Sequence, residues 1–282
     1  GPNPRGMRIL VTGAAGFIGA AVSQALVARG DTVFGIDNLN DYYPVSLKHD
    51  RLSRVSSAPG GERFVFHQLD FSDDAALTEA LAGQEIDAIV HLGAQAGVRY
   101  SIEAPRSYVE ANLIGTFNVM EAARELQVGH LLMASTSSVY GANEDMPFRE
   151  VDKADHPLTI YAATKKANEA MGHAYAHIHD MPVTMFRFFT VYGPWGRPDM
   201  APFKFTKAIL AGEPIDIYNN GEMWRDFTYV TDLVQGILGL IDAVPLRPAT
   251  RAEIAEGDSL SPAAQAFHAL ALEHRPGAGE TT

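Results

Sequence analysis

The feature that most restricts the fold of this chain is a glycine-rich turn placed between a strand and a helix. Residues 8–12 are apolar and rich in β-forming side chains, which is typical of a strand buried on both faces. The turn follows at once, with glycines three residues apart at Gly13, Gly16 and Gly19. A helical pattern then ends at Gly30, and a second strand pattern at 32–36 ends in Asp37. This order predicts a βαβ unit that binds a dinucleotide.

Each part of this unit has a physical reason to contact a dinucleotide. Glycines let the backbone approach a pyrophosphate, which the unpaired N–H groups of a helix N-terminus attract. The carboxylate of Asp37 would accept hydrogen bonds from the hydroxyls of the adenosine ribose. Asn38 follows it, and the turn holds no Arg that would balance a 2′-phosphate. We therefore predict NAD rather than NADP as the cofactor.

The alternation of strands and helices continues along the chain. Further strand patterns occupy 64–69, 87–91, 130–134 and 183–188, and long helical patterns occupy 106–126 and 160–179. Such alternation predicts an α/β fold with a Rossmann-type doubly wound parallel sheet. Ligands of these sheets bind at the carboxyl ends of the strands. Candidate contacts fall at those ends, namely the glycine turn, Asp37, Asp70, Leu92 with Gly93, and Thr136.

The pattern loosens after the last of these strands, where we expect a smaller substrate-binding part. Residues 190–199 are rich in turn formers, and we expect no core there. Beyond them we expect a helix near 203–211, a short strand at 225–230 and a helix over 231–243. We therefore divide the chain into a leader or cloning remnant (1–6), an NAD-binding domain (7–189), substrate-binding cap elements (190–245) and an atypical C-terminal tail (246–282).

Composition argues against several other kinds of protein. The 282 residues include 22 basic and 34 acidic side chains, a formal net charge of -12, and no basic stripe. We therefore expect neither a nucleic acid nor a membrane as a partner. Without cysteine there is no disulfide framework and no Cys-based zinc site, and we predict no metal. We find no secretory signal and no apolar run of bilayer length, so we expect a cytoplasmic protein.

A second chemical signature is Tyr161 followed four residues later by Lys165 in a helical segment. The two side chains share one helix face, where an ammonium favours the phenolate and makes Tyr161 a usable general base. The same spacing also occurs on ordinary amphipathic helices. The Thr136 hydroxyl would bind the substrate oxygen whose proton Tyr161 removes. The alternative is a hydroxyl at the end of a strand that only forms hydrogen bonds with backbone groups. Asn112 is either an exposed polar residue in mid-helix or a buried one that supports the site.

The glycine turn, the Thr136-Ser137-Ser138 segment and the Tyr161–Lys165 pair together resemble the extended short-chain dehydrogenase/reductase family, in its NAD-dependent epimerase/dehydratase branch. Three further segments resemble UDP-glucuronate 4-epimerases within it. They are residues 37–43, 95–99 and 187–200, of which the last is the most specific. The resemblance covers roughly residues 7–245.

The resemblance implies a reaction and a partner. UDP-glucuronate would be oxidised at C4 to a ketone, and the hydride would return to the other face of the turned ring to give UDP-galacturonate. The protein would form a homodimer through the long helices at 106–126 and 160–179. The substrate would be a UDP-sugar, and carbohydrate metabolism would be the context.

The resemblance also implies the roles of individual residues. The catalytic set is Thr136, Tyr161 and Lys165, which position the oxygen, take its proton and stabilise the phenolate. The cofactor-binding set is Gly13, Gly16, Phe17, Ile18, Gly19, Asp37, Asn38, Asp70, Phe71, Leu92, Gly93, Asn112, Tyr161 and Lys165. The substrate-binding set is Thr136, Ser137, Ser138, Thr190, Arg197 and Arg225. In this set Thr190 and Arg197 match the positions that meet the sugar carboxylate, and Arg225 matches one that contacts the nucleotide. Arg99 is a weaker candidate, with exposed surface charge as its other interpretation.

Three alternatives stay open. Decarboxylases and 4,6-dehydratases of this family carry acidic residues just after the Thr, where this chain has Ser137 and Ser138. The two serines favour epimerisation without an acid at C5, and the next interpretation is a UDP-glucuronate decarboxylase or a UDP-hexose 4-epimerase. Family members continue for several elements past the position of Pro245, whereas this chain ends at residue 282. A truncated, non-catalytic NAD-binding protein is the alternative of another class.

Overall fold

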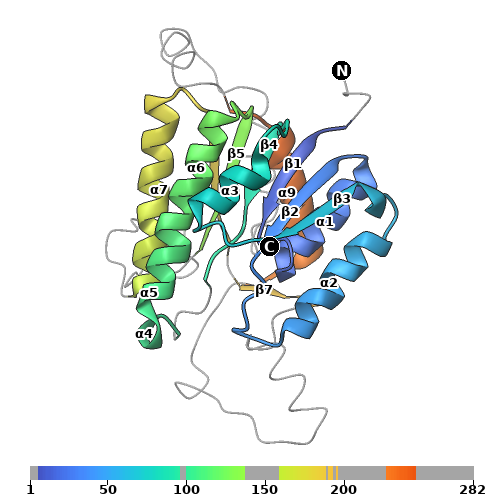
Figure 1. Ribbon diagram of the computed structural model, residues 1–282, viewed down its shortest axis with the longest axis horizontal. Coiled ribbons are helices and arrows are strands. Elements are labelled where there is room, and N and C mark those ends of the chain that lie inside the picture. The colour runs from blue at the N-terminus through green and yellow to red at the C-terminus, as the bar shows by residue number, and fades with distance from the viewer. Residues whose placement is uncertain are drawn as a thin grey trace, which may run out of the picture.

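The structure is a computed structural model that describes residues 6–95, 100–136, 159–188, 190–192, 195 and 227–245 (Figure 1). Its centre is one parallel sheet of six strands in the order β3-β2-β1-β4-β5-β6. The strands are β1 Arg8–Thr12, β2 Thr32–Asp37, β3 Phe64–Gln68, β4 Ala88–His91, β5 His130–Thr136 and β6 Val183–Phe188. The order reverses between β1 and β4, which confirms the predicted fold and fixes the crevice where ligands of such sheets bind.

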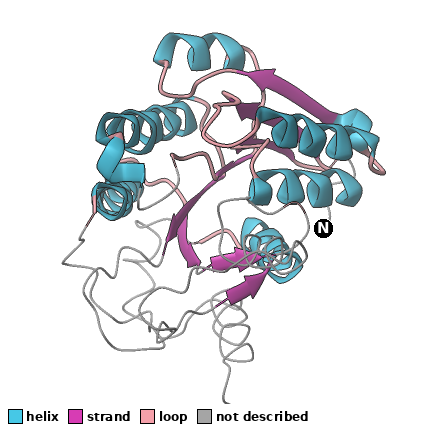
Figure 2. Ribbon diagram, turned by 90° about the horizontal axis from the view of Figure 1, so that it is seen from below, coloured by secondary structure: helices cyan, strands magenta, loops and turns pink. Residues whose placement is uncertain are grey.

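Helices cover both faces of this sheet (Figures 1 and 2). On one face, α1 (Phe17–Arg29) contacts both α2 (Val45–Ser57) and α9 (Val230–Asp242). On the other face lie α3 (Asp74–Leu81), α6 (Thr116–Glu125) and α7 (Ile160–Ile178). The shorter helices are η1 Gly61–Arg63, α4 Tyr100–Glu103, α5 Pro105–Tyr108 and the π-helix η2 Val109–Gly115.

Side chains of the central strands alternate between two apolar cores. Ile9 and Val11 of β1 pack in the first core with α1 and α9, whereas Leu10 packs in the second core with α3 and α6. All three are fully buried. A strand buried on both faces needs apolar residues at every position, which explains the uninterrupted apolar run that predicted β1.

The end of α1 follows the predicted signal. Gly30 adopts the left-handed conformation with φ 106°, and its N–H donates to the Val27 carbonyl at 3.1 Å. Arg29 in the last turn pairs with Asp31 and with Asp242 of α9, both at 2.8 Å. The turn therefore reverses the chain into β2 and also ties α1 to the last described helix.

Several elements differ from the sequence expectations. The helices α2 and α3 were not expected at all. The helical pattern at 106–126 is not one uniform helix, because the π-helix η2 separates α5 from α6. Thr190–Tyr192, in the segment expected to be turn-rich, forms strand β7 and pairs in parallel with β8, Phe227–Tyr229.

The helix α9 lies within the segment expected to bind substrate, but it packs in the first core. Its buried residues Val234, Ile237 and Ile241 join the same cluster as α1. This helix therefore contributes to the Rossmann core, while the division of the chain at residue 190 stays a prediction. The expected helix at 203–211 and the tail from 246 onward lie outside the described residues. Of the helices that the structure describes, none combines the length and apolar character needed to cross a bilayer.

Candidate active site

The glycine-rich turn joins the end of β1 to the start of α1 and leaves no room for side chains. Gly13 has φ 68°, a left-handed conformation that favours glycine. A Cβ at Gly13 would lie 2.9 Å from the Cα of Gly93, which follows β4. A Cβ at Gly19 would lie 2.0 Å from the Gly13 carbonyl oxygen. Glycine at these positions therefore allows β1, β4 and α1 to converge on the turn.

The N-terminus of α1 presents backbone N–H groups without a competing side chain. Gly16 begins the helix with no side-chain cap, and the first turn carries no acidic residue. Phe17 is buried in the first core and Ile18 packs against it, so these residues offer only their backbone N–H groups at the helix end. These groups and the helix dipole favour a phosphate there. The donor set fits the pyrophosphate of a dinucleotide.

Asp37 lies at the end of β2 and is bonded to the glycine turn. Its Oδ2 accepts the Ala15 N–H at 3.1 Å, and its Oδ1 accepts the Leu39 N–H at 2.8 Å. Each carboxylate oxygen keeps a further lone pair for a ribose hydroxyl. Asn38 accepts the Asn40 N–H at 3.1 Å and so orders the next turn. Asp37 thus positions the turn and keeps the acceptor capacity that the sequence predicted for it.

The residues that follow β3 and β4 lie against each other. Asp70 is exposed, and its Oδ1 accepts the N–H and O–H of Ser72 at 2.9 and 2.7 Å. The Phe71 ring is buried, and a Cβ at Gly93 would lie 2.5 Å from it. Glycine at 93 therefore lets the ring pack beneath the turn. Leu92 is partly buried and packs against the first core.

A buried hydrogen-bond chain holds the end of β4 in place. Thr12 Oγ1 accepts the N–H groups of Leu92 and Gly93 at 3.0 and 2.9 Å, so its own O–H donates to His91 Nδ1, 2.6 Å away. The His91 ring therefore carries its proton on Nε2 and donates it to Thr116 Oγ1 at 2.8 Å. Burial lowers the pKa of His91 to about 3, so the ring is neutral at pH 7.

Asn112 is fully buried in the π-helix η2, as the second interpretation of this residue requires. Its Oδ1 accepts the Gln95 N–H at 2.8 Å, and its Nδ2 donates to the Gln95 carbonyl at 3.2 Å. Nδ2 also lies 3.3 Å from Thr164 Oγ1, which donates to the Tyr161 carbonyl at 3.0 Å. Asn112 thus links the segment after β4 to the first turn of α7. Its direct contact with a cofactor stays a prediction.

Tyr161 lies in the first turn of α7, and its position is fixed from two directions. The Thr159 hydroxyl caps this helix by accepting the Ala162 N–H at 3.1 Å. The fully buried Tyr108 ring lies edge-on to the Tyr161 ring, with centroids 6.0 Å apart. The phenol is therefore carried by a capped helix and packed against a rigid aromatic neighbour.

Lys165 lies one helical turn after Tyr161 and reaches the end of β5. It is buried, and its Nζ donates to the Ala134 carbonyl at 3.2 Å, two residues before Thr136 at the strand end. Burial lowers the pKa of Lys165 to about 8, while the carboxylate of Glu169 opposes this shift. The ammonium therefore stays mostly protonated at pH 7 and can stabilise a phenolate on the same helix face.

The other predicted residues are not placed by the described part of the chain. Thr136 ends β5 and Thr190 begins β7, as their strands show, but their side chains are not described. Ser137, Ser138, Arg197, Arg225 and Arg99 lie outside the described residues. Their contacts with a substrate stay predictions.

Three buried polar residues near the turn were missed by the sequence analysis. They are His91, Lys48 and Arg51. Lys48 Nζ donates to the Asn40 carbonyl and Oδ1 at 2.7 and 2.8 Å, and Arg51 Nη1 donates to the Ala15 carbonyl at 3.2 Å. For Lys48 and Arg51 the sequence does contain a signal, because the two cations are three residues apart and so share one face of a helix.

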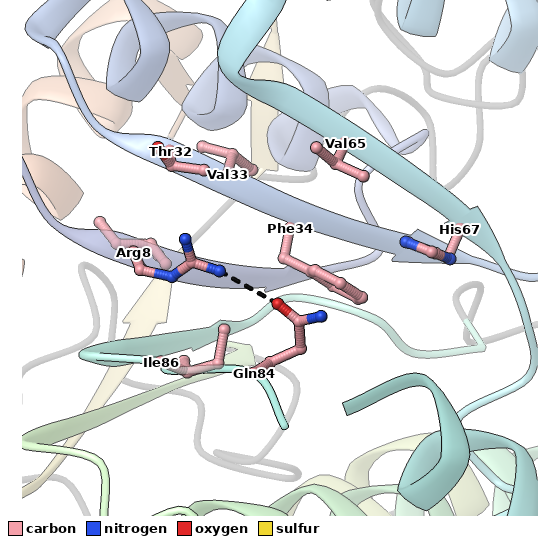
Figure 3. A pocket seen from close by; sticks show the side chains of 9 residues that line it. Arg8, Thr32, Val33, Phe34, Val65, His67, Gln84 and Ile86 are labelled. Atoms are coloured by element: carbon pink, nitrogen blue, oxygen red, sulfur yellow. Dashed lines mark hydrogen bonds between the residues drawn. The ribbon is translucent and has the colours of Figure 1, made fainter. Parts of the chain in front are cut away.

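A separate hollow of about 250 Å³ lies on the sheet, as Figure 3 shows. It is lined mainly by the first residues of β1 and β2, including Arg8 and Thr32, together with Val65 and His67 of β3. The glycine turn and Asp37 lie instead at the carboxyl ends of these strands. The hollow is therefore not part of the candidate active site.

Comparisons with known proteins agree with this geometry. Residues 9–250 match the NAD dependent epimerase/dehydratase family. "Protein CapI" of Staphylococcus aureus is 49% identical over 91% of this chain and 76% of its own length. A "Probable UDP-glucuronate 4-epimerase" of Rhizobium meliloti is 53% identical over 85% of this chain and 69% of its own length.

A solved structure has the same fold. The crystal structure of UDP-glucuronic acid 4-epimerase from Bacillus cereus, in complex with UDP-glucuronic acid and NAD, superposes with a TM-score of 0.76 at 35% identity. The match covers 84% of this chain and 73% of that one. The sheet order, the glycine turn and the Tyr161–Lys165 helix define a Rossmann-type protein that handles a dinucleotide. The chain belongs to the NAD dependent epimerase/dehydratase family, which confirms the resemblance drawn from its motifs.

Proposed function

We propose that this chain is an NAD-dependent nucleotide-sugar epimerase that converts UDP-glucuronate to UDP-galacturonate at C4. The observation that carries the proposal is the hydrogen bond from Lys165, one helical turn after Tyr161, to the Ala134 carbonyl near the end of β5. The glycine turn and Asp37 lie at the same carboxyl end of the parallel sheet. The Rhizobium meliloti relative and the Bacillus cereus enzyme support the choice of substrate.

The residues of the site divide the chemistry between them. Tyr161 accepts the proton of the C4 hydroxyl, because the Lys165 ammonium stabilises the phenolate form. Thr136 positions the same oxygen, and Lys165 also binds the cofactor ribose. The bound cofactor supplies hydride transfer at C4. After the ring turns its other face, Tyr161 returns the proton to the oxygen at C4.

A second requirement is that the intermediate keeps its carboxylate. A 4-keto uronate is a β-keto acid, which loses carbon dioxide when the breaking bond aligns with the carbonyl. Thr190 and Arg197 hold the carboxylate away from that alignment, since a guanidinium pairs well with a planar carboxylate. Arg225 binds the nucleotide. Ser137 and Ser138 offer no acid to move a proton at C5, which favours epimerisation over decarboxylation.

The other interpretations have distinct products. A UDP-glucuronate decarboxylase would give a UDP-pentose and carbon dioxide, and a UDP-hexose 4-epimerase would act on the neutral sugar. A non-catalytic NAD-binding protein would keep NAD and make no product. The fold and the Tyr161–Lys165 pair alone do not distinguish these alternatives, but the two serines favour the epimerase.

We also propose that the protein forms a homodimer and acts in the cytoplasm. Support for the dimer comes from exposed apolar side chains near one another, Ile114 of η2, Phe117 of α6 and Ile178 of α7. The Phe117 ring contacts Tyr175 of α7 edge-on, with centroids 6.3 Å apart. An exposed apolar patch that spans neighbouring helices, here η2, α6 and α7, is typical of an interaction surface.

The experiment that tests the function compares two tyrosines of the same helix. Tyr161→Phe removes only the proposed base, and we expect the turnover of UDP-glucuronate to fall by about 10²–10⁴-fold, as loss of general base catalysis does. The purified variant should still contain NAD, because the glycine turn and Asp37 are unchanged. Tyr175→Phe is the matched control, because the Tyr175 phenol donates to Glu121 and burial raises its pKa to about 12. Its turnover should equal that of the wild type. Equal turnover in wild type and Tyr161→Phe would refute the assignment of the base.

A further inference from the structure

The most unusual charged residue in the described part of the chain is Arg51 of α2. Its side chain is 1% exposed, yet no carboxylate of the described residues pairs with its guanidinium. A buried cation is costly unless its N–H groups are all satisfied. Four of the five N–H groups of Arg51 donate to oxygen acceptors, which come from three separate segments.

The first acceptor belongs to the glycine-rich turn. Arg51 Nη1 donates to the Ala15 carbonyl at 3.2 Å, while the Ala15 N–H donates to Asp37 Oδ2 at 3.1 Å. Ala15 lies between two of the motif glycines, which on their own allow many backbone conformations. The two contacts hold consecutive peptide groups of the turn. Asp37 therefore binds the N–H of Ala15 and Arg51 binds its carbonyl, so both backbone groups of this residue are held in place.

The second set of contacts reaches a distant part of the sequence. Arg51 Nε and Nη2 donate to the Trp195 carbonyl at 3.0 and 2.6 Å, and Nη1 also donates to the Tyr43 hydroxyl. Trp195 lies in the 187–200 segment, two residues before Arg197. The rigid guanidinium thus bonds the cofactor turn and the segment that we assign to the sugar at the same time. A lysine ammonium lacks the planar fork that does this.

We propose that Arg51 is a positioning residue that locks the glycine-rich turn to the Trp195 segment and so couples dinucleotide binding to nucleotide-sugar binding. This inference rests on the proposed function, because the Trp195 segment is assigned to the sugar by that function. Coupling of this kind is reciprocal: a ligand on one side of the bridge strengthens binding on the other. A bound uridine nucleotide should therefore slow the release of NAD.

The test measures the release rate of NAD from the NAD-loaded protein, with and without saturating UDP. Wild-type protein should release NAD more slowly when UDP is present. Arg51→Met should release NAD at least tenfold faster, and UDP should no longer slow it. Arg54→Met is the matched control, because Arg54 lies over the Trp195 ring at 5.5 Å but makes none of the three bridging contacts. This variant should behave as the wild type.

A second variant covers the case in which Arg51→Met does not fold. Arg51→Lys keeps the positive charge but loses the fork, and we expect faster NAD release and a weaker UDP effect. Wild-type release rates in either folded Arg51 variant, or the same loss in Arg54→Met, would overturn the proposal. Lower thermal stability with an unchanged UDP effect would also overturn it, because that is the result of a purely structural role.

These outcomes are separate from those of the proposed function. A protein that binds NAD and UDP and shows the coupling, but makes no UDP-galacturonate, would leave the role of Arg51 intact and reject the epimerase. If UDP did not bind at all, the release rate of NAD alone would still decide whether Arg51 holds the turn.

Discussion

At the carboxyl end of β4, the His91 imidazole lies between the hydroxyls of Thr12 and Thr116, and burial keeps it neutral. Protonation would place a donor on Nδ1, where the Thr12 O–H already donates. The neutral ring therefore holds Thr12 in the orientation that binds the N–H groups of Leu92 and Gly93. The proton state of one residue thus supports the backbone on which the cofactor would lie.

This arrangement predicts a loss of stability in acid. The pKa of His91 is about 3 in the folded chain and near 6.5 when unfolded, so between these values the unfolded state binds more protons. Stability from this group is complete above pH 6.5 and falls as the pH decreases toward 3. Each pH unit in this window costs about 1.4 kcal/mol. Urea unfolding at pH 7.5 and pH 5.0 measures the change.

The control for this measurement is a residue that does not titrate in this range. His91→Asn keeps a polar side chain, and we expect its free energy of unfolding to fall by about 2 kcal/mol less than that of the wild type between the two pH values. The same decrease in both proteins would show that His91 is not held neutral.

At the scale of the element, the junction of β1 and α1 depends on glycine where the helix passes the turn. Gly19→Ala places a Cβ against the Gly13 carbonyl oxygen, and neither backbone segment can move away without repacking. We expect a loss of about 1–3 kcal/mol in the free energy of unfolding and a lower NAD content in the purified protein.

A matched glycine in another helix separates this steric effect from helix propensity. Gly236 of α9 is exposed, and a Cβ there meets no atom within 4 Å. Gly236→Ala should therefore be neutral or stabilise the protein by up to about 1 kcal/mol. Gly19→Ala protein with wild-type stability and NAD content would contradict the close approach of helix and turn.

The elements differ in how well the sequence predicted them, for a physical reason. The strands β1 and β4 are buried on both faces, so their apolar runs were sufficient to place them. The helix α2 was missed because only one of its three buried residues, Val55, is apolar, while the other two are Lys48 and Arg51. Burial of Arg51 depends on carbonyl acceptors of Ala15 and Trp195, which lie far from it in the sequence.

The residues of the candidate active site also divide into those that the sequence predicted and those that it did not. Residues carried by local motifs, such as the glycine turn, Asp37 and the Tyr161–Lys165 pair, were predicted. The chain of Thr12, His91 and Thr116 joins three segments through side-chain hydrogen bonds, and no local pattern encodes such contacts. The π-helix around Asn112 was likewise hidden within a continuous helical pattern.

For the whole molecule, the apolar patch on η2, α6 and α7 predicts the oligomeric state. Light scattering during size exclusion should give the mass of a dimer for the wild type. Phe117→Glu places a charge within the patch, where Phe117 is 44% exposed, and should give monomers. Val65→Glu is the control, because Val65 is exposed to a similar extent, 47%, on β3. A monomeric wild type, or a dimeric Phe117→Glu, would contradict the proposed interface.

The central claim is a reaction at C4 that spares C5 and the carboxylate. Proton magnetic resonance of the purified protein with UDP-glucuronate in deuterated water observes C4 and C5 directly, and it reports loss of the carboxylate as the appearance of a UDP-pentose. We expect UDP-galacturonate that retains protium at C4 and C5, with no carbon dioxide released. A UDP-pentose with carbon dioxide, deuterium at C4 or C5, or unchanged UDP-glucuronate beside NAD-loaded protein would contradict the account.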